Sequence, residues 1–306
     1  MQRLVSGRAA GWAALAATVS IWAGYLIIAR AAMTGEAGTA YSPVEMGLLR
    51  VGPAALLFLP VLLRSGLRPQ GMSWGQVTLL AAAGGVAFVY FITAGLVHAP
   101  VADAAVFTPS MMPLFAAGLA VLLLGERPDG ARLAGFGLIL LGAAAVGGYE
   151  ALVRGTQGAW RGHLLFLCAS LSWALYTVAF RRTTTSPLTG AAVLSFWAVP
   201  GFLLLAAFHP APLFGQPLPD IVLQALLQGV LSGFLATLLF FVAITRLGMG
   251  PAAAAAGLVP GLSALGAWVF LAEPLGPFKL AGIAVVSLGV VLASGALSAR
   301  GESVRK

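Results

Sequence analysis

The sequence predicts an all-α integral membrane protein with ten transmembrane helices, arranged as two inverted five-helix repeats. Composition is the first observation, since 60% of the 306 residues are hydrophobic and only 8% are charged. So much apolar surface does not fit inside one water-soluble globule. The number of apolar stretches is the second observation, and an internal repeat is the third. We therefore expect the lipid bilayer to surround this chain.

Ten apolar stretches are bounded by turn residues or charges. Each is close to the roughly 20 residues that a helix needs to cross a hydrocarbon core about 30 Å thick. They lie near residues 10–32, 43–63, 74–97, 101–124, 132–149, 162–180, 187–208, 220–245, 250–272 and 277–297. The breaks at 97–101 and 246–250 are the weakest, and a stricter reading would merge the stretches beside them.

The first stretch follows Arg3 and Arg8 and could instead be a signal peptide. Its apolar run is longer than a signal core and has no clear cleavage site before Arg30, which favours a transmembrane helix. Later boundaries carry the glycine, proline and charge of interfacial turns. Examples are RSGLRPQG at 64–71, GERPDGAR at 125–132 and HPAPLFGQPLPD at 209–220.

A phrase in the first stretch recurs 151 residues later, since SIWAGYLIIAR at 20–30 and LSWALYTVAFR at 171–181 share Trp, Ala, Tyr and Arg. Further along, at an offset of 147, Pro113 matches Pro260 and Glu126 matches Glu273. We therefore predict a tandem duplication of about five helices. After an odd number of crossings the second copy begins on the opposite side of the membrane, so the two copies are inverted. The predicted divisions are a first repeat over 1–150, a second repeat over 158–298 and a cytoplasmic tail over 299–306.

Positive charge predicts the orientation, because cytoplasmic loops are enriched in Lys and Arg. With the N-terminus inside, twelve of the 17 cations fall on the cytoplasmic side and Arg50 lies within a span. The outer side receives only Arg30, Arg154, Arg161 and Lys279. Both termini are then cytoplasmic. The net charge of +8 reflects this bias and does not indicate a nucleic-acid partner.

Inverted repeats are typical of transporters, whose halves exchange conformations around a central site. Three segments, in this order and spacing, resemble the EamA branch of the drug/metabolite transporter superfamily over residues 10–297. They are GERPDGARLAGFGLILLGAAAV at 125–146, GHLLFLCASLSWALYTVAFRR at 162–182 and LAEPLGPFKLAGIAVVSLGVVLAS at 271–294. The resemblance implies export or exchange of small metabolites, often amino acids or their relatives, across a bacterial inner membrane.

Arg50 is the first candidate for contacting a substrate, because an unpaired cation about seven residues inside the second span is costly in lipid. It could bind a substrate carboxylate. It could also belong to the scaffold, by snorkelling outward or by pairing with Glu45. The matching position in the second repeat is Trp197, so the charge is not part of the duplicated pattern.

Aromatic residues form the second candidate set. Trp22 and Tyr25 share a three-residue spacing with Trp173 and Tyr176, which puts each pair on one helix face. Their depth in each span favours cavity lining over the aromatic belt of an interface. Packing between helices is the remaining alternative.

Three further residues are weaker candidates for binding a substrate. Tyr90 and Trp197 are aromatic residues within spans. Gln228 places an amide deep in the eighth span, where it could bond the polar end of a substrate or only a neighbouring helix.

Prolines at matched positions are candidate hinges or gates. Pro109 and Pro113 interrupt the fourth span and Pro260 interrupts the ninth. A proline inside a span removes a helical hydrogen bond and frees carbonyl groups that water or a ligand could use.

Acidic residues mark the ends of the fourth and ninth spans. Glu126 and Glu273 each precede a cation by six residues, Arg132 and Lys279, which suggests local ion pairs or helix-turn anchors that could tighten alternately as each face closes. Asp103, near the start of the fourth span, is interpreted as a helix cap.

The sequence predicts a secondary transporter that moves a small neutral or zwitterionic metabolite out of the cell by alternating access. An amino acid with an apolar or aromatic side chain fits the candidate residues. Small multidrug exporters of the superfamily carry a glutamate in their first helix, whereas here nothing acidic lies between Arg8 and Glu36. The alternative is a multidrug exporter or an exporter of another metabolite, such as a nucleoside or polyamine. A channel and an intramembrane enzyme are weaker alternatives.

Enzyme chemistry is not expected, because the three histidines lie far apart in sequence without metal-ligand spacing. No phosphate-binding glycine loop followed by lysine occurs, so we expect neither ATP nor any other cofactor, and no metal. Cys168 is the only cysteine, which excludes an intramolecular disulfide. The small-molecule substrate is the expected partner, and the oligomeric state stays open, a homo-oligomer included.

Overall fold

The computed structural model describes residues 2–35, 40–149, 158–208 and 213–294, which contain helices, turns and loops but no strand. The predicted tail at 299–306 and the predicted boundary at 150–157 lie outside these residues. The helices are α1 (Gln2–Thr34), α2 (Pro43–Ser65), α3 (Trp74–Leu80), η1 (Ala81–Ala87), α4 (Phe88–His98), α5 (Val101–Phe107), α6 (Met112–Leu124), α7 (Gly130–Gly148), α8 (Ala159–Phe180), α9 (Pro187–Ala207), α10 (Leu218–Gln224), η3 (Ala225–Leu235), α11 (Ala236–Leu247), α12 (Met249–Ala256), α13 (Val259–Leu271) and α14 (Pro277–Ala293).

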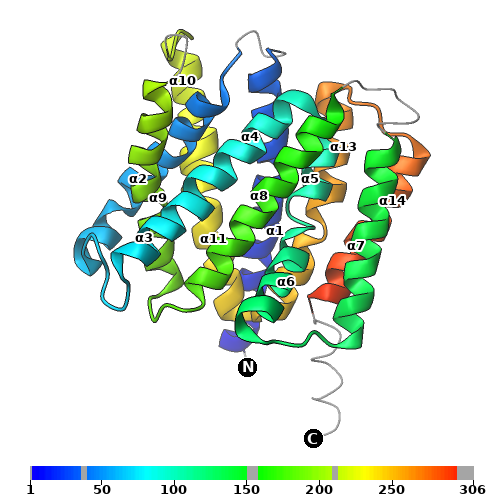
Figure 1. Ribbon diagram of the computed structural model, residues 1–306, viewed down its shortest axis with the longest axis horizontal. Helices are drawn as coiled ribbons and strands as arrows, with labels where there is room; N and C mark the ends of the chain where they lie inside the picture. The colour runs from blue at the N-terminus through cyan, green and yellow to red at the C-terminus, as the bar shows by residue number, and fades with distance from the viewer. Residues whose placement is uncertain (1, 36–39, 150–157, 209–212, 295–306) are drawn as a thin grey trace, which may run out of the picture.

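Nine helical segments of the described chain are long and apolar enough to cross a membrane, and α14 is a shorter apolar helix of 17 residues. Together they agree with about ten spans. The bundle has two ends, which we call the upper end, where α1 ends and α2 begins, and the lower end, where α1 begins (Figure 1). α14 also ends at the lower end.

Polar side chains cap the N-termini of several helices. Ser42 accepts a hydrogen bond from the Glu45 backbone while the Glu45 carboxylate accepts one from the Ser42 backbone, which forms a capping box at α2. Asp129 caps α7 by accepting from the Arg132 backbone. These residues satisfy backbone N–H groups that have no partner within the helix.

The fourth and ninth spans are each broken into two helices at the positions where the prolines predicted an interruption. α5 ends at Phe107 and α6 begins at Met112, with Pro113 in its first turn. α12 ends at Ala256 and α13 begins at Val259, with Pro260 in its first turn. The first turn tolerates proline because its N–H groups lack helical partners anyway.

The two repeats share fine geometry at the ends of these broken spans. Gly125 and Ala272 both adopt the left-handed conformation, with φ of 69° and 50°. Directly after them, Glu126 and Glu273 donate their backbone N–H groups to Ala120 and Ala267 respectively. All three pairs are separated by 147 residues. This agreement supports the duplication that the sequence predicts.

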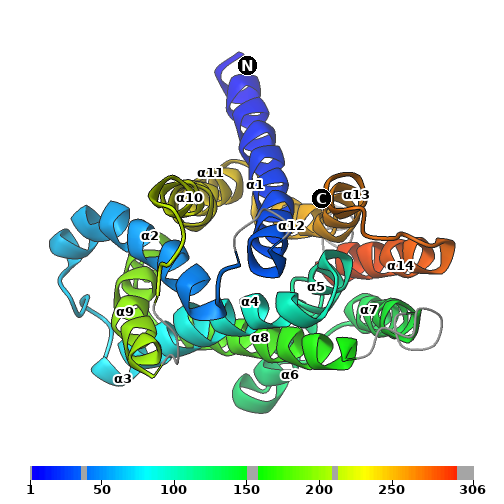
Figure 2. The ribbon, with the colours of Figure 1, turned by 90° about the horizontal axis from the view of Figure 1, so that it is seen from above.

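Helices α7 and α14 pack side by side through glycines at matched positions (Figure 2). A Cβ on Gly135 would lie 2.7 Å from the Gly289 carbonyl oxygen, and one on Gly142 would lie 2.6 Å from that of Gly282. Gly282 is the equivalent of Gly135 in the second repeat, and Gly289 is the equivalent of Gly142. Gly135 therefore contacts the equivalent of Gly142, and Gly142 contacts the equivalent of Gly135. Such reciprocal contacts are typical of a two-fold relationship.

Two π-helical segments occur in the third and eighth spans, which are equivalent in the two repeats. They are η1 and η3. π-Helical turns widen the helix locally and are frequent at functional sites. The sequence pattern carried no sign of them.

Candidate functional site

Arg50 of α2 lies between residues of both repeats. Its Nη1 donates a hydrogen bond of 2.9 Å to the Ser232 hydroxyl of η3, and its guanidinium lies 4.1 Å above the centre of the Tyr25 ring of α1. Among the described residues, Arg50 has no carboxylate within 4.0 Å. Hydrogen bonding and the ring face thus hold a cation whose charge is not neutralised by a neighbour.

Close packing of α2 against η3 brings Gln228 into the same region. A Cβ on Gly229 would lie 2.6 Å from the Leu49 carbonyl oxygen, and one on Gly233 would lie 3.1 Å from that of Arg50. Gln228 is buried one turn before Ser232, and its amide donates to Gln224. The structure therefore gathers Arg50, Tyr25, Ser232 and Gln228 around the α2–η3 contact.

Two polar atoms in this group have no hydrogen-bond partner among the described residues. They are the Tyr25 hydroxyl oxygen and Gln228 Oε1, both fully buried. A buried polar atom without a partner is costly, and it commonly marks a place where water or a ligand binds.

The pairing of Arg50 with Glu45 that the sequence offered is wrong for this structure. Glu45 accepts hydrogen bonds from the backbones of Ser42 and Phe214, the second at 2.7 Å. The carboxylate caps α2 and ties it to the segment before α10.

The two predicted aromatic pairs make different contacts in the structure. Trp173 and Tyr176 contact each other at 4.9 Å between ring centres, and Trp173 also packs on Phe88 of α4 at 4.8 Å. Trp22 packs instead on Phe240 of α11, with 5.0 Å between ring centres. Of these four residues, Tyr25 is the one that joins Arg50.

The remaining candidates lie in other contacts. Tyr90 packs against Phe91 at 6.0 Å. The Trp197 indole donates a hydrogen bond to the Leu67 carbonyl, and its ring meets Trp74 edge-on at 5.6 Å. The polar atom of Trp197 is therefore bonded to the scaffold.

The break in the fourth span is stabilised from the second repeat. The Ser170 hydroxyl of α8 lies 2.9 Å from the Phe107 carbonyl and 2.6 Å from the Thr108 carbonyl. Pro109 follows within the break. The hydroxyl thus shares its single hydrogen between two carbonyls that a continuous helix would have bonded.

An ion pair joins the two repeats at the upper end. Arg30 at the end of α1 lies 3.5 Å from Glu273, and both side chains are mostly buried, with 18% and 14% exposed. Glu273 also accepts hydrogen bonds from the Val101 backbone at the start of α5. Burial raises the pKa of the Glu273 carboxyl above its ordinary value of 4.5. The charges of Arg30 and Lys279 and the hydrogen bond from the Val101 N–H lower the pKa, but burial has the larger effect.

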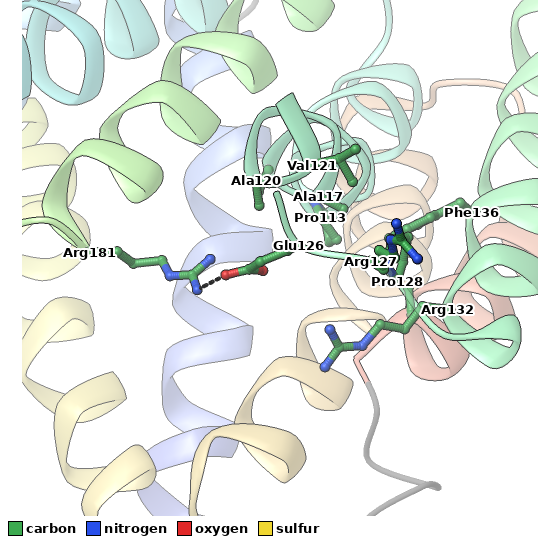
Figure 3. A pocket seen from close by; sticks show the side chains of 12 residues that line it. Pro113, Ala117, Ala120, Val121, Glu126, Arg127, Pro128, Arg132, Phe136 and Arg181 are labelled. Atoms are coloured by element: carbon green, nitrogen blue, oxygen red, sulfur yellow. Dashed lines mark hydrogen bonds and ion pairs between the residues drawn. The ribbon is translucent and has the colours of Figure 1, made fainter. Parts of the chain in front are cut away.

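A matching ion pair joins the repeats at the lower end. Arg181, which follows α8 directly, donates to Glu126, which follows α6, and both side chains are exposed, at 49% and 43% (Figure 3). These residues line a pocket of about 170 Å³, together with Pro113, Arg127 and Arg132.

These partners correct one of the two local pairs that the sequence suggested and add a partner to the other, since Lys279 still acts electrostatically on Glu273. Glu126 bonds Arg181 in place of Arg132, and Arg132 instead lies 3.9 Å from Asp129. Glu273 pairs with Arg30 across the repeats. The sequence offered neighbours along the chain, whereas helix packing brings the charges of opposite repeats together.

Asp103 forms a buried cluster near the upper pair. Its Oδ1 lies 2.7 Å from Lys279 Nζ of α14, and its Oδ2 lies 2.7 Å from His163 Nε2 of α8. The Asp103 and Lys279 side chains are 0% and 1% exposed. The interpretation of Asp103 as a helix cap is wrong, because this carboxylate bonds side chains of two other helices.

Sequence reasoning missed this cluster. The sequence placed Lys279 and His163 at span ends, far from Asp103 along the chain. The signal that could have indicated it is a carboxylate, an imidazole and an ammonium at the same predicted membrane face. In the described part of the chain, no group of three or more His, Cys, Asp or Glu residues could hold a metal ion.

Apolar helices with charged and polar groups held between two repeats define a multi-pass membrane protein built as a transporter. Comparison with known families specifies it further. The EamA-like transporter family matches residues 9–148 and again residues 160–295, so the chain belongs to this family.

A curated relative agrees with this assignment, and a solved structure shares the fold. The "Probable terminal-alkyne amino-acid exporter" of Streptantibioticus cattleyicolor is 28% identical over 288 residues, which cover 91% of each chain. A solved structure described as "Crystal structure of protein" has a TM-score of 0.62 at 18% identity, and the match covers 94% of this chain and 97% of that one. The likeness to the solved structure shows a shared fold.

Proposed function

We propose that this transporter moves a small amino acid out of the cell by alternating access of two inverted repeats. The unneutralised guanidinium of Arg50 is the observation that carries the proposal. A cation inside a membrane protein favours a negative partner, and a substrate carboxylate would supply one. The planar guanidinium suits a carboxylate, which it can bond through two parallel N–H groups.

The unpartnered atoms near Arg50 support a zwitterionic substrate. A substrate ammonium group could donate to the Tyr25 hydroxyl and to Gln228 Oε1, which lack partners in the described residues. Glu45 and Asp103, which could have drawn a cationic drug, are already bonded to other groups. The opposite ends of an amino acid thus fit the donors and acceptors present.

The relative from S. cattleyicolor supports an amino acid with an apolar side chain. Its name describes export of a terminal-alkyne amino acid. Carried over to this chain as a hypothesis, the name agrees with the aromatic ring of Tyr25 beside Arg50, which would offer apolar surface to such a side chain.

The matched ion pairs support alternating access. Arg30–Glu273 and Arg181–Glu126 occupy equivalent positions of the two repeats, yet the upper pair is mostly buried and the lower pair is exposed beside a pocket. We infer that the upper end is closed and the lower end partly open. If the charge bias places the lower end in the cytoplasm of a bacterial cell, substrate would enter there.

Flux through proteoliposomes tests the substrate. Vesicles carrying the native protein are preloaded with one unlabelled neutral amino acid at a time, and uptake of the radiolabelled amino acid is followed. We expect saturable exchange, reduced at least about tenfold by Arg50→Ala, because charge-assisted hydrogen bonds contribute about 1.5–3 kcal/mol. Arg50→Lys should restore part of the flux.

The matched control is Arg64→Ala, which removes an exposed arginine from the lower end of the same helix. This variant should exchange at the native rate. Exchange that is equal in the native, Arg50→Ala and Arg64→Ala proteins would contradict the role of Arg50. A complete lack of exchange with every amino acid would contradict the substrate class.

A further inference from the structure

The buried cluster of Asp103, His163 and Lys279 is not explained by the duplicated scaffold. At the offset of 147, Asp103 corresponds to Gly250 and Lys279 to Arg132, and at the offset of 151, His163 corresponds to Trp12. The Arg–Glu pair occurs at both ends of the bundle, but within the described ranges this cluster occurs at the upper end alone. A feature added to one of two equivalent ends can make the two ends respond differently.

Stability is a weak reason for burying these charges. The desolvation of two charges commonly offsets their attraction, so a buried ion pair contributes little compared with apolar residues of the same size. The cluster nevertheless places a carboxylate with 0% exposure between an ammonium and an imidazole, each at 2.7 Å. His163 is further held by ring stacking on Phe107, with 4.6 Å between ring centres.

The three side chains join helices that must move in alternating access. Asp103 belongs to α5 of the first repeat, whereas His163 and Lys279 belong to α8 and α14 of the second. Opening the upper end would move the repeats relative to each other and admit water to this region. The surroundings of all three groups would therefore change between the closed and open states.

Charge balance decides which state binds a proton more tightly. In the closed state Lys279 already neutralises Asp103, so a proton added to His163 or Asp103 leaves an uncompensated positive charge in a buried place. Water solvates that charge once the upper end opens. The open state consequently binds the proton more tightly, and acid favours the open state by the same factor.

We propose that Asp103, His163 and Lys279 form a proton-binding site, and that proton uptake from the outer solution favours opening of the upper end. The proton adds to the imidazole of His163, whose Nε2 lies 2.7 Å from the Asp103 carboxylate, and it returns to water when the site is deprotonated. The proposal rests on the alternating access of the proposed function, but it does not depend on which substrate is carried.

Other titratable groups lie near the upper end, and their contribution to a pH response must be distinguished from that of this site. Arg30 faces the cluster from α1, Glu273 from the segment before α14, and Tyr149 from the end of α7, next to Gly276. His98 at the end of α4 and Arg161 at the start of α8 are exposed. Glu273 is the chief competitor, because it lies close to Asp103 and Lys279.

Thiol labelling without substrate tests the proposal. In a Cys168→Ala background, Val101→Cys places a thiol at a position with 0% exposure at the upper end. Leu218→Cys gives an exposed reference thiol at the same end, where the leucine is 70% exposed. Right-side-out vesicles are treated with a membrane-impermeant charged maleimide between pH 5 and pH 8. We divide the labelling rate of the Val101→Cys thiol by that of the Leu218→Cys thiol, so that the pH dependence of the maleimide reaction itself cancels.

We expect the ratio to rise roughly tenfold toward pH 5, the change that one linked proton produces per pH unit at most. His163→Gln, which keeps a hydrogen bond to Asp103 but cannot take the proton, should flatten the response. Lys279→Met should abolish or reverse it, because protonated His163 would then neutralise Asp103 in the closed state. Asp129→Asn, which changes an exposed carboxyl at the lower end outside the Arg181–Glu126 pair, should leave the response intact.

Several outcomes would overturn the proposal. They are a ratio that does not change with pH in the parent, no labelling of the Val101→Cys thiol at any pH, and a parental response that persists in both the His163→Gln and Lys279→Met variants. Loss of the response in Glu273→Gln alone would assign the proton to Glu273 instead. Because no substrate is present, failure of amino-acid exchange and failure of this proposal are distinguishable.

Discussion

Arg50 and Glu273 show how one ionisable side chain depends on its neighbours. Arg50 is held by the Ser232 hydroxyl and the Tyr25 ring, and its charge remains available. Glu273 is bonded to Arg30 and to the Val101 backbone, and its charge is engaged in this contact between the repeats at the upper end. A substrate role thus fits the first residue and a gating role the second.

The raised pKa of Glu273 predicts a pH-dependent stability. Between the ordinary value of 4.5 and the higher value in the folded state, the folded protein binds a proton that the unfolded chain has lost. This contribution to the free energy of unfolding therefore falls as the pH rises through that window. Thermal unfolding in detergent should show the native protein losing stability relative to Glu273→Gln from pH 4.5 upward.

Glu126→Gln is the matched comparison, since it changes the equivalent glutamate in an exposed ion pair. Exposed pairs contribute about 0–1 kcal/mol, so the gap between this variant and the native protein should stay within that range. A native protein that gains stability over Glu273→Gln as the pH rises would show that Arg30 and Lys279 outweigh burial.

At the scale of the elements, glycines decide how closely helices approach. α7 and α14 meet through carbonyl groups that lie where a Cβ would stand on Gly135 or Gly142. In lipid such close backbone contact is a main source of helix association, because hydrophobic burial contributes little between apolar helices. The contact joins the last helix of each repeat.

Gly142→Ala should therefore destabilise the protein by about 1–3 kcal/mol, the usual effect of overpacking. Gly137→Ala is the control on the same helix, because that position has no neighbour within 4 Å of an added Cβ. Thermal unfolding of the two variants gives the comparison. Equal unfolding temperatures would contradict the packing of α7 on α14.

At the scale of the whole molecule, the charge bias predicts which end faces the cytoplasm. Gln70 is exposed at the lower end and Leu218 at the upper end. In a Cys168→Ala background on intact cells, an impermeant maleimide should label the Leu218→Cys variant but not the Gln70→Cys variant. Disrupting the cells should expose both thiols, and the reverse pattern before disruption would invert the proposed orientation.

Several features of the fold were predictable because they depend on short segments. Apolar length predicted the spans, Pro113 and Pro260 predicted where two spans break, and Trp22–Tyr25 and Trp173–Tyr176 revealed the repeat. The π-helical segments were not predictable, because their widened hydrogen bonding leaves the apolar composition of the span unchanged.

The sequence by itself determined that this chain is a helical membrane protein of the EamA-like family, because hydropathy, charge bias and repeated motifs are properties of the chain alone. Only the tertiary structure decided which charges are partners. Arg30 and Glu273 lie 243 residues apart in sequence, and Asp103 lies 176 residues from Lys279. Such pairs form where helices of the two repeats pack, so they follow from the three-dimensional arrangement of both repeats, which local spacing does not contain.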